Sequence, residues 1–311
     1  DDDISTIGLA GIMNVPGGKE EGDEIAVYYA YGDIVDGASG AFSQSESVID
    51  GTKVSKDLEN LADDDDVKAV VIRINSGGGS AYASEQMWRA IQLVKAKKPV
   101  VVSMGGMAAS GGYYMSCSAN WIVAEPTTLT GSIGIFGMFP DMSGLITQKL
   151  GVKFDEVKTN KNSAFGTMAR PFSEEEMAYL SSYISRGYSL FRQRVADGRH
   201  MSVDAVEKVA QGHVWVGQDA LKIKLVDQLG GLDDAVAKAA KLAKLDEYYT
   251  ASYPGKADWL DQFMSAMSSG SYIDNQMRAA MGEYYSTFML LKDINKQSAI
   301  QARIPYMVNI K

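Results

Sequence analysis

The chain has 311 residues, of which 46% are hydrophobic and 22% charged, so it is long and apolar enough to fold around a substantial core. Its formal net charge is -9 and no basic stripe offsets the acidic excess, which argues against a nucleic-acid partner. No stretch approaches the roughly 20 apolar residues of a membrane-spanning helix. The chain begins without a methionine, which suggests a processed form or a fragment.

Three regions are expected in chain order. Residues 1–22 are rich in glycine and acidic residues and are expected to be a lead-in segment or linker. Residues 23–245 alternate strand-like and helix-like patterns and predict one α/β domain. Residues 246–311 carry methionines and aromatic residues at helical spacings. This pattern favours a helical extension used for packing or oligomerisation, with membrane docking or peptide capture as alternatives.

The α/β region contains several repeats of strand, glycine-rich loop and helix. Expected strands cover residues 24–31, 67–74, 98–104, 121–124 and 225–227, and expected helices cover residues 47–62, 83–94, 111–118, 173–195, 202–210, 217–221 and 232–243. Residues 128–134 are interpreted as a loop of small residues. Because a strand, a crossover helix and a second strand form a βαβ unit, the sheet is expected to be parallel with right-handed connections.

One candidate nucleophile lies in the octet Gly-Gly-Met-Ala-Ala-Ser-Gly-Gly at residues 105–112, where Ser110 is the only side chain able to do covalent chemistry. An apolar strand precedes it, and the small residues allow a sharp turn into a helix. Such a turn would expose the serine at the end of the sheet, where helix N–H groups favour developing negative charge. A close-packed crossover in which Ser110 merely caps the helix is the alternative.

Residues 77–79 form a second glycine-rich loop between a strand and a helix. The loop fails the dinucleotide-binding pattern because position 82 is tyrosine rather than glycine. Its other use is to aim backbone N–H groups at an oxyanion, which predicts a nucleophile at the end of a neighbouring strand. Ser110 is expected at such a position.

The base that would activate Ser110 is not evident from the residues. His200 and His213 lie in polar loops without an acid that would identify a triad, and both are expected to be ordinary loop or packing residues. A lysine kept neutral by burial is the remaining option. The only cysteine, Cys117, lies among small residues, which favours a buried structural thiol over a nucleophile.

Three segments resemble the signal peptide peptidase A family, bacterial serine peptidases of the Clp-protease/crotonase superfamily. They are residues 101–113, 128–134 and 210–220, and the resemblance extends over about residues 23–245. It is closer to the second half of the long, tandem-repeat form of the family than to the short form. The resemblance implies an α/β fold of repeated ββα units with a helical C-terminal extension, and no cofactor or metal.

By this resemblance, Ser110 is the nucleophile that attacks the scissile carbonyl. The amide of Gly111, with that of Gly78 or Gly79, would form the oxyanion hole, and Ser132 would orient a general-base lysine. The loop of the family usually has proline where this chain has Gly77. This substitution loosens the turn.

The resemblance leaves two sources for the lysine. In the short form the lysine corresponds to Ser163 of this chain, and Lys161 lies two residues earlier, displaced by about 6 to 7 Å on an extended segment, so it is a weak candidate. In the long form the first half of the polypeptide supplies the lysine. We favour this second source, which leaves the chain with a nucleophile and no base of its own.

The resemblance therefore implies a serine endopeptidase of the Ser/Lys type that hydrolyses remnant signal peptides. Its substrate would be an extended apolar peptide bound at a strand edge beside residues 77–80. Its partners would be further copies of itself and the N-terminal half of the same polypeptide, at the bacterial inner membrane with the catalytic domain on the periplasmic side. Two alternatives remain: a noncatalytic peptide-binding or assembly module, and a crotonase-type acyl-CoA enzyme that needs no nucleophilic serine.

Overall fold

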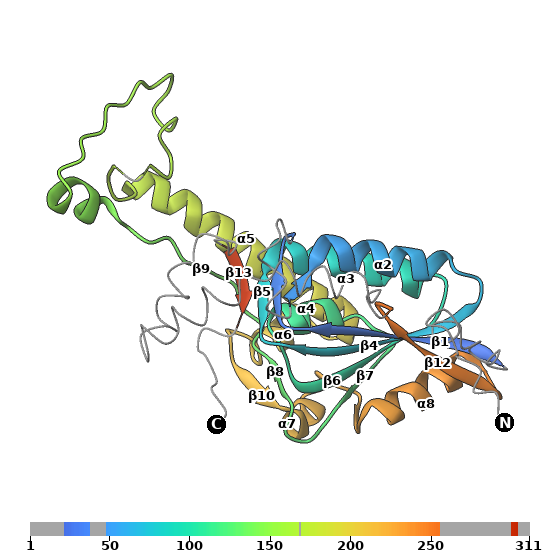
Figure 1. Cartoon of the computed structure of the whole chain (residues 1–311). Coiled ribbons are helices and arrows are strands. Elements are labelled where there is room, and N and C mark those ends of the chain that lie inside the picture. The colour runs from blue at the N-terminus through green and yellow to red at the C-terminus, as the bar shows by residue number, and fades with distance from the viewer. Residues whose placement is uncertain (1–21, 38–47, 168, 256–299, 304–311) are drawn as a thin grey trace, which may run out of the picture.

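The computed structural model describes residues 22–37, 48–167, 169–255 and 300–303. Helices cover both faces of a twisted sheet, and a smaller sheet lies at one end of it (Figure 1). The larger sheet consists of β1 (Asp23–Tyr31), β4 (Val67–Ser76), β6 (Val100–Ala109), β7 (Trp121–Ala124), β8 (Leu129–Gly131), β10 (Val214–Val216), β11 (Gln228–Leu229) and β12 (Tyr248–Tyr253). Its strand order is β10-β8-β6-β4-β1-β12, and β7 pairs with β6 and β11.

The smaller sheet has the order β3-β2-β5-β13-β9 within the described part of the chain. Its strands are β2 (Asp33–Val35), β3 (Val48–Asp50), β5 (Gly78–Ser80), β9 (Phe136–Gly137) and β13 (Ile300–Arg303). β13 pairs antiparallel with both β5 and β9. A short segment near the C-terminus of the chain therefore lies against the glycine-rich loop that follows β4.

The helices are α2 (Gly51–Asp63), α3 (Ala81–Lys95), α4 (Gly111–Ser116), α5 (Glu174–Arg199), α6 (Val203–Glu207), α7 (Gly217–Lys222) and α8 (Leu232–Ala243), with a π-helical turn η2 (Gly144–Lys149). α2 and α3 cover one face of the larger sheet and α8 covers the other (Figure 1). Alternate residues of each central strand enter different cores. In β4, Val70 and Ile72 pack in the α2/α3 core, and Ala69 and Val71 pack in the α8 core. Burial on both faces explains the continuous apolar runs of these strands.

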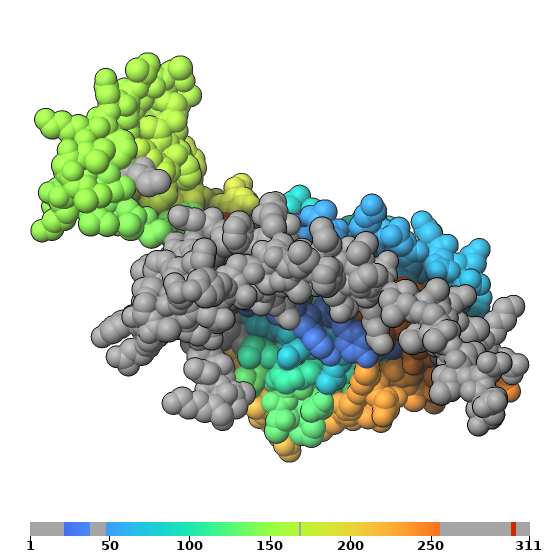
Figure 2. Space-filling view, in the orientation of Figure 1, coloured from blue at the N-terminus to red at the C-terminus, as the bar shows by residue number. Residues whose placement is uncertain are grey.

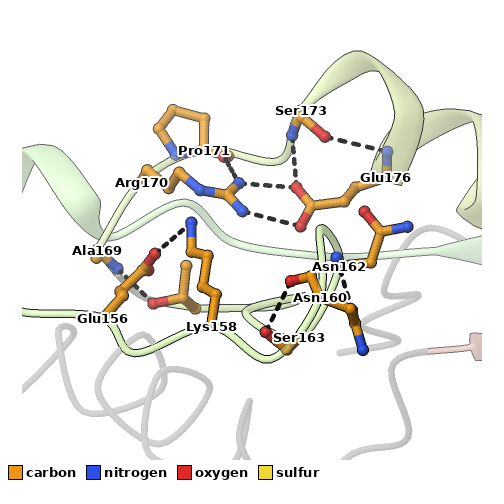
Figure 3. A network of polar contacts seen from close by, with 11 residues as sticks. Glu156, Lys158, Asn160, Asn162, Ser163, Ala169, Arg170, Pro171, Ser173 and Glu176 are labelled. Atoms are coloured by element: carbon orange, nitrogen blue, oxygen red, sulfur yellow. Dashed lines mark hydrogen bonds and ion pairs between the residues drawn. The ribbon is translucent and has the colours of Figure 1, made fainter.

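Residues 138–167 and 169–172 form an arm that projects from the body together with the first turns of α5 (Figures 1 and 2). A polar network ties the arm to the start of α5 (Figure 3). The Arg170 guanidinium donates to both carboxylate oxygens of Glu176 at 2.7 and 3.0 Å, and Ser173 and Glu176 form a reciprocal capping box. The capping box expected from the sequence is confirmed, and α5 runs four residues beyond the expected end at about Val195.

The parallel βαβ arrangement is confirmed, since β1, β4, β6 and β7 pair in parallel. Several local expectations were wrong. Val48–Asp50, expected at the start of a helix, forms β3 because it pairs with β2. Residues 225–227, expected as a strand, form a bend before β11, which is Gln228–Leu229. Leu129–Gly131, expected in a loop, forms β8 because its backbone pairs with Met107–Ala109 of β6. Tyr248–Tyr253, expected in a helical extension, forms β12 because these residues pair with the exposed edge of β1.

Other expectations lie outside the described residues. These are the lead-in segment up to residue 21 and the methionine- and aromatic-rich part of the C-terminal region at residues 256–299 and 304–311. None of the helices in the described part of the chain combines the length and apolar character that crossing a bilayer requires.

Candidate active site

Ser110 links the carboxyl end of β6 to the first residue of α4. Its backbone has φ 52° and ψ -112°, a conformation that a residue with a side chain rarely adopts. Its N–H donates to the Gly131 carbonyl at 2.8 Å, and its own carbonyl accepts from Tyr114 N–H at 2.7 Å. The side chain is 0% exposed, and its hydroxyl has no hydrogen-bond partner among the described residues. The predicted turn into a helix is present, whereas the solvent-exposed hydroxyl that we expected is not.

Ser132 lies beside Ser110 because β8 runs parallel to β6. Ala109 is in register with Gly131, so the two serines follow paired residues at the same end of the sheet. Ser132 also has a positive φ of 49°, and its N–H donates to the His213 carbonyl at 2.8 Å. The fold thus brings together two serines that are 22 positions apart in the sequence.

The glycine loop after β4 faces the start of α4. Gly78 and Gly79 both have positive φ, at 101° and 155°. A Cβ on Gly78 would lie 2.7 Å from Gly111 N and would overlap the Ala302 carbonyl, whereas a Cβ on Gly79 would overlap Ile34 of β2. Gly78 is therefore the loop glycine beside Gly111, and Gly79 packs against β2. The Gly78 N–H donates to Ser76 Oγ at 3.1 Å in this arrangement.

Hydrogen bonds of two serines, Ser80 and Ser84, hold this loop in place, and the sequence did not reveal them. Ser80 Oγ donates to Asp36 and accepts from Ala83 N–H, and so caps α3. Ser84 Oγ donates to the Ser80 carbonyl at 2.7 Å and lies 2.6 Å from where a Cβ on Gly111 would be. The only sequence signal was a serine directly before a helical pattern, which is typical of an N-cap.

Lys161 does not contact Ser110 in this structure. Its side chain is 80% exposed on the arm and forms an ion pair with Glu175. The hydrogen bond to Glu175 raises the pKa of Lys161, which is opposite to what a general base requires. Ser163, at the position of the short-form lysine, donates to the Asn160 carbonyl at 3.0 Å (Figure 3).

The other nucleophile and base candidates have structural roles. The His213 ring packs against Trp215 with 4.1 Å between ring centroids. His200 ends α5 in the left-handed conformation, with φ 53°. Cys117 is fully buried, and burial raises the pKa of its thiol to about 12, so the expectation of a structural thiol is confirmed.

A mostly parallel sheet, in which only β10 pairs antiparallel within the described residues, glycine-rich turns and a serine at a strained strand-to-helix junction define an α/β protein of the Clp-protease-like class. Residues 42–123 match the Clp protease family. Residues 92–246 match Peptidase family S49. The chain belongs to this peptidase family, as the resemblance implied.

Relatives from bacteria and a plant are similar to the chain in sequence. The chain is 42% identical over 250 residues to "Protease 4" of Salmonella typhi, covering 80% of this chain and 39% of that protein. It is 39% identical over 234 residues to "Serine protease SPPA, chloroplastic" of Arabidopsis thaliana, covering 75% and 34%. It is 36% identical over 202 residues to "Putative signal peptide peptidase SppA" of Enterococcus faecium, covering 63% and 57%. The chain thus spans little more than a third of the first two relatives.

Proposed function

We propose that this chain is the nucleophile-bearing part of a serine endopeptidase that hydrolyses remnant signal peptides. The observation that carries the proposal is the Ser110 junction, where a strained backbone holds a hydroxyl with no hydrogen-bond partner among the described residues, directly before Gly111, which faces Gly78. Strained backbone persists only where the surrounding structure enforces it, and it concentrates at functional sites. The names of the relatives from Arabidopsis thaliana and Enterococcus faecium support the serine-protease and signal-peptide parts of the proposal.

In the proposed reaction, Ser110 Oγ forms a bond to the scissile carbonyl carbon while its proton passes to a neutral lysine. The carbonyl oxygen becomes an oxyanion, and the Gly111 amide stabilises it with the amide of Gly78 or Gly79. The oxyanion then returns to a carbonyl as the scissile C–N bond breaks, and the lysine gives its proton to the leaving amine. Water next attacks the acyl-enzyme carbonyl while the neutral lysine takes its proton, and the proton returns to Ser110 Oγ as the ester bond breaks. Ser132 orients the lysine, a role supported by its position beside Ser110 at the end of β8.

The lysine is proposed to come from outside this chain, from the N-terminal half of a longer polypeptide. Three observations support this source. Ser110 Oγ has no partner in the described part of the chain, and Lys161 is paired with Glu175 on the arm. The chain also spans only 39% of the Salmonella typhi relative, which leaves room for such a half.

The proposal includes a location and further partners. The assembled enzyme is proposed to act at the bacterial inner membrane, with its catalytic domain on the periplasmic side, on apolar peptides left after secretion. Further copies of the chain are proposed to complete the assembly. The exposed apolar side chains of the arm support this part of the proposal.

A covalent serine probe tests the catalytic assignment. A fluorophosphonate is added to this chain alone and to the chain mixed with the complementary N-terminal half, and labelling is measured by gel fluorescence and peptide mass spectrometry. We expect labelling to rise at least tenfold with the added half. Ser110→Ala should reduce it at least 100-fold, and Ser132→Ala by about 10-fold to 100-fold, because a misoriented base transfers protons less efficiently.

The control is Ser252→Ala, which changes an exposed serine on β12 and should label as the parent chain does. Loss of labelling in the control as well would point to unfolding. If Ser110 remains unlabelled when the complementary half is present, this result would contradict the peptidase proposal and favour a noncatalytic peptide-binding module. Binding of coenzyme A without Ser110 labelling would favour the acyl-CoA enzyme.

A further inference from the structure

β13 lies between β5 and β9 in the smaller sheet. The four residues Ile300–Arg303 run antiparallel to β5, with Gln301, Ala302 and Arg303 in register with Ser80, Gly79 and Gly78. On its other side, β13 pairs with Phe136–Gly137 of β9. Without β13, the edges of β5 and β9 would both lack this partner, and an extended peptide can bind such edges by main-chain hydrogen bonds.

The position of Ala302 links this strand to the candidate active site. Its side chain is 0% exposed, and its carbonyl oxygen lies where it would overlap a Cβ on Gly78 and approach a Cβ on Gly111 to 2.9 Å. A Cβ on Gly78 would also lie 2.7 Å from Gly111 N. The absence of side chains at these two glycines therefore makes room for one carbonyl group from β13.

We propose that Ile300–Arg303 is an intrachain pseudosubstrate strand, which holds the peptide-binding edge of β5 closed until an incoming peptide displaces it. The proposal rests on the proposed function, because it takes the carbonyl that enters between Gly78 and Gly111 to be that of the substrate. Ala302 is then the residue whose carbonyl imitates the scissile one.

The strength of such a block follows from its attachment to the same chain. A strand of four residues contributes few hydrogen bonds, and each hydrogen bond adds only a little to stability because water would otherwise satisfy the same groups. Attachment makes its binding intramolecular, with an effective concentration in the millimolar range. Such a strand prevents binding of peptides that have low affinity or low concentration. Peptides that bind the edge of β5 more tightly displace it.

A peptide-binding experiment tests the proposal without depending on catalysis. The parent is the full chain with Ser110→Ala, so that hydrolysis cannot contribute. The probe is a fluorescent hexapeptide with the sequence of residues 299–304, Ala-Ile-Gln-Ala-Arg-Ile, and binding is followed by fluorescence anisotropy. Ala302→Glu puts an unpaired charge at a fully buried position and should release β13. We expect it to tighten peptide binding at least tenfold.

The matched control is Ser252→Glu, which puts the same charge at an exposed position on β12 and should bind the probe as the parent does. Equal affinity in the parent and the Ala302→Glu chain would overturn the proposal and make β13 an ordinary structural strand. Loss of probe binding in the Ala302→Glu chain would also overturn it. Fluorophosphonate labelling of Ser110 in otherwise unmodified chains is read separately, so failure of the peptidase proposal is distinguished from failure of this one.

Hydrogen exchange gives a second measurement that needs no change in β13. Excess hexapeptide is added to the parent chain, and amide exchange is measured at residues 78–80 and 301–303. We expect residues 301–303 to exchange faster with peptide present, because the peptide takes their place, while residues 78–80 remain protected. Peptide binding that leaves the exchange of residues 301–303 unchanged would contradict displacement.

Discussion

Ser110 and Ser132 both hold positive φ angles, which cost residues with side chains about 1–3 kcal/mol each. Their backbone hydrogen bonds enforce these conformations, since Ser110 N–H is held by Gly131 and Ser132 N–H by the His213 carbonyl. Glycines around them allow the close approach of neighbouring backbone. The same close packing makes the site sensitive to the smallest added group.

The first residue-scale prediction concerns the methyl group of an alanine at position 111. Gly111→Ala would put a Cβ 2.6 Å from Ser84 Oγ and 2.9 Å from the Ala302 carbonyl, so we expect it to lower the free energy of unfolding. Overpacking of this kind costs about 1–3 kcal/mol. Chemical denaturation measures the effect. Gly144→Ala is the control, because a Cβ there meets nothing within 4 Å, and a loss as large in the control would contradict the explanation.

At the scale of elements, α5 connects the arm to the body. Its C-terminal half is anchored in the core by Phe191 and Val195, and Arg194 pairs with Glu85 of α3 at 2.5 Å while it covers the Trp88 ring. Its first turn depends on Glu176 instead. The hydrogen bonds from Arg170, followed by the backbone N–H of Ser173, lower the pKa of Glu176 to about 2 from the ordinary 4.5. The start of this helix is therefore stabilised by one ionised carboxylate.

A pH dependence follows from the lowered pKa of Glu176. Because the folded chain favours the ionised form, the stabilisation is complete above about pH 5 and is lost as the pH falls towards 2. Glu176→Gln should lower the melting temperature at pH 7 and show a smaller further decrease between pH 5 and pH 2.5 than the parent. Thermal unfolding followed by circular dichroism measures this difference. The control is Glu174→Gln at an exposed position of the same turn. If the control shows an equally small decrease of the melting temperature between pH 5 and pH 2.5, the assignment to Glu176 is contradicted.

At the scale of the whole molecule, the arm stands apart from the body (Figure 2). Its large apolar side chains are widely exposed, including Leu150, Phe154 and Val157, and Val157 is 96% exposed. An apolar surface of this kind on a projecting element is typical of a protein contact. The proposed homo-oligomer would cover it.

The oligomer proposal predicts a change of mass when the arm is made polar. The double variant Leu150→Asp, Val157→Asp should sediment as a smaller species than the parent chain in analytical ultracentrifugation, because a buried unpaired carboxylate disfavours an apolar contact. Leu242→Asp changes an exposed leucine on α8 of the body and is the control. A parent chain that is monomeric, or arm variants that keep the parent mass, would contradict this prediction.

The sequence by itself determined the order of most helices and strands and the place of Ser110 between β6 and α4. These features depend on local signals, namely apolar runs, helix caps and glycine-rich turns, which act over a few neighbouring residues. The catalytic assignment of Ser132 came only by family resemblance. A serine before a helical pattern signalled the N-cap at Ser80, but no local pattern identified the hydrogen bonds that link Ser84 and Ser80 to Asp36.

Only the tertiary structure decided which distant residues meet. β8 was mistaken for a loop because a three-residue strand is stabilised by its pairing with β6 and not by its own propensity. The same reason explains β12, which was expected to be helical, and β13, whose place on β5 no pattern in residues 300–303 indicated. The burial of Ser110 and the separation of Lys161 from it are also long-range outcomes, because they depend on how chain segments far apart in sequence pack.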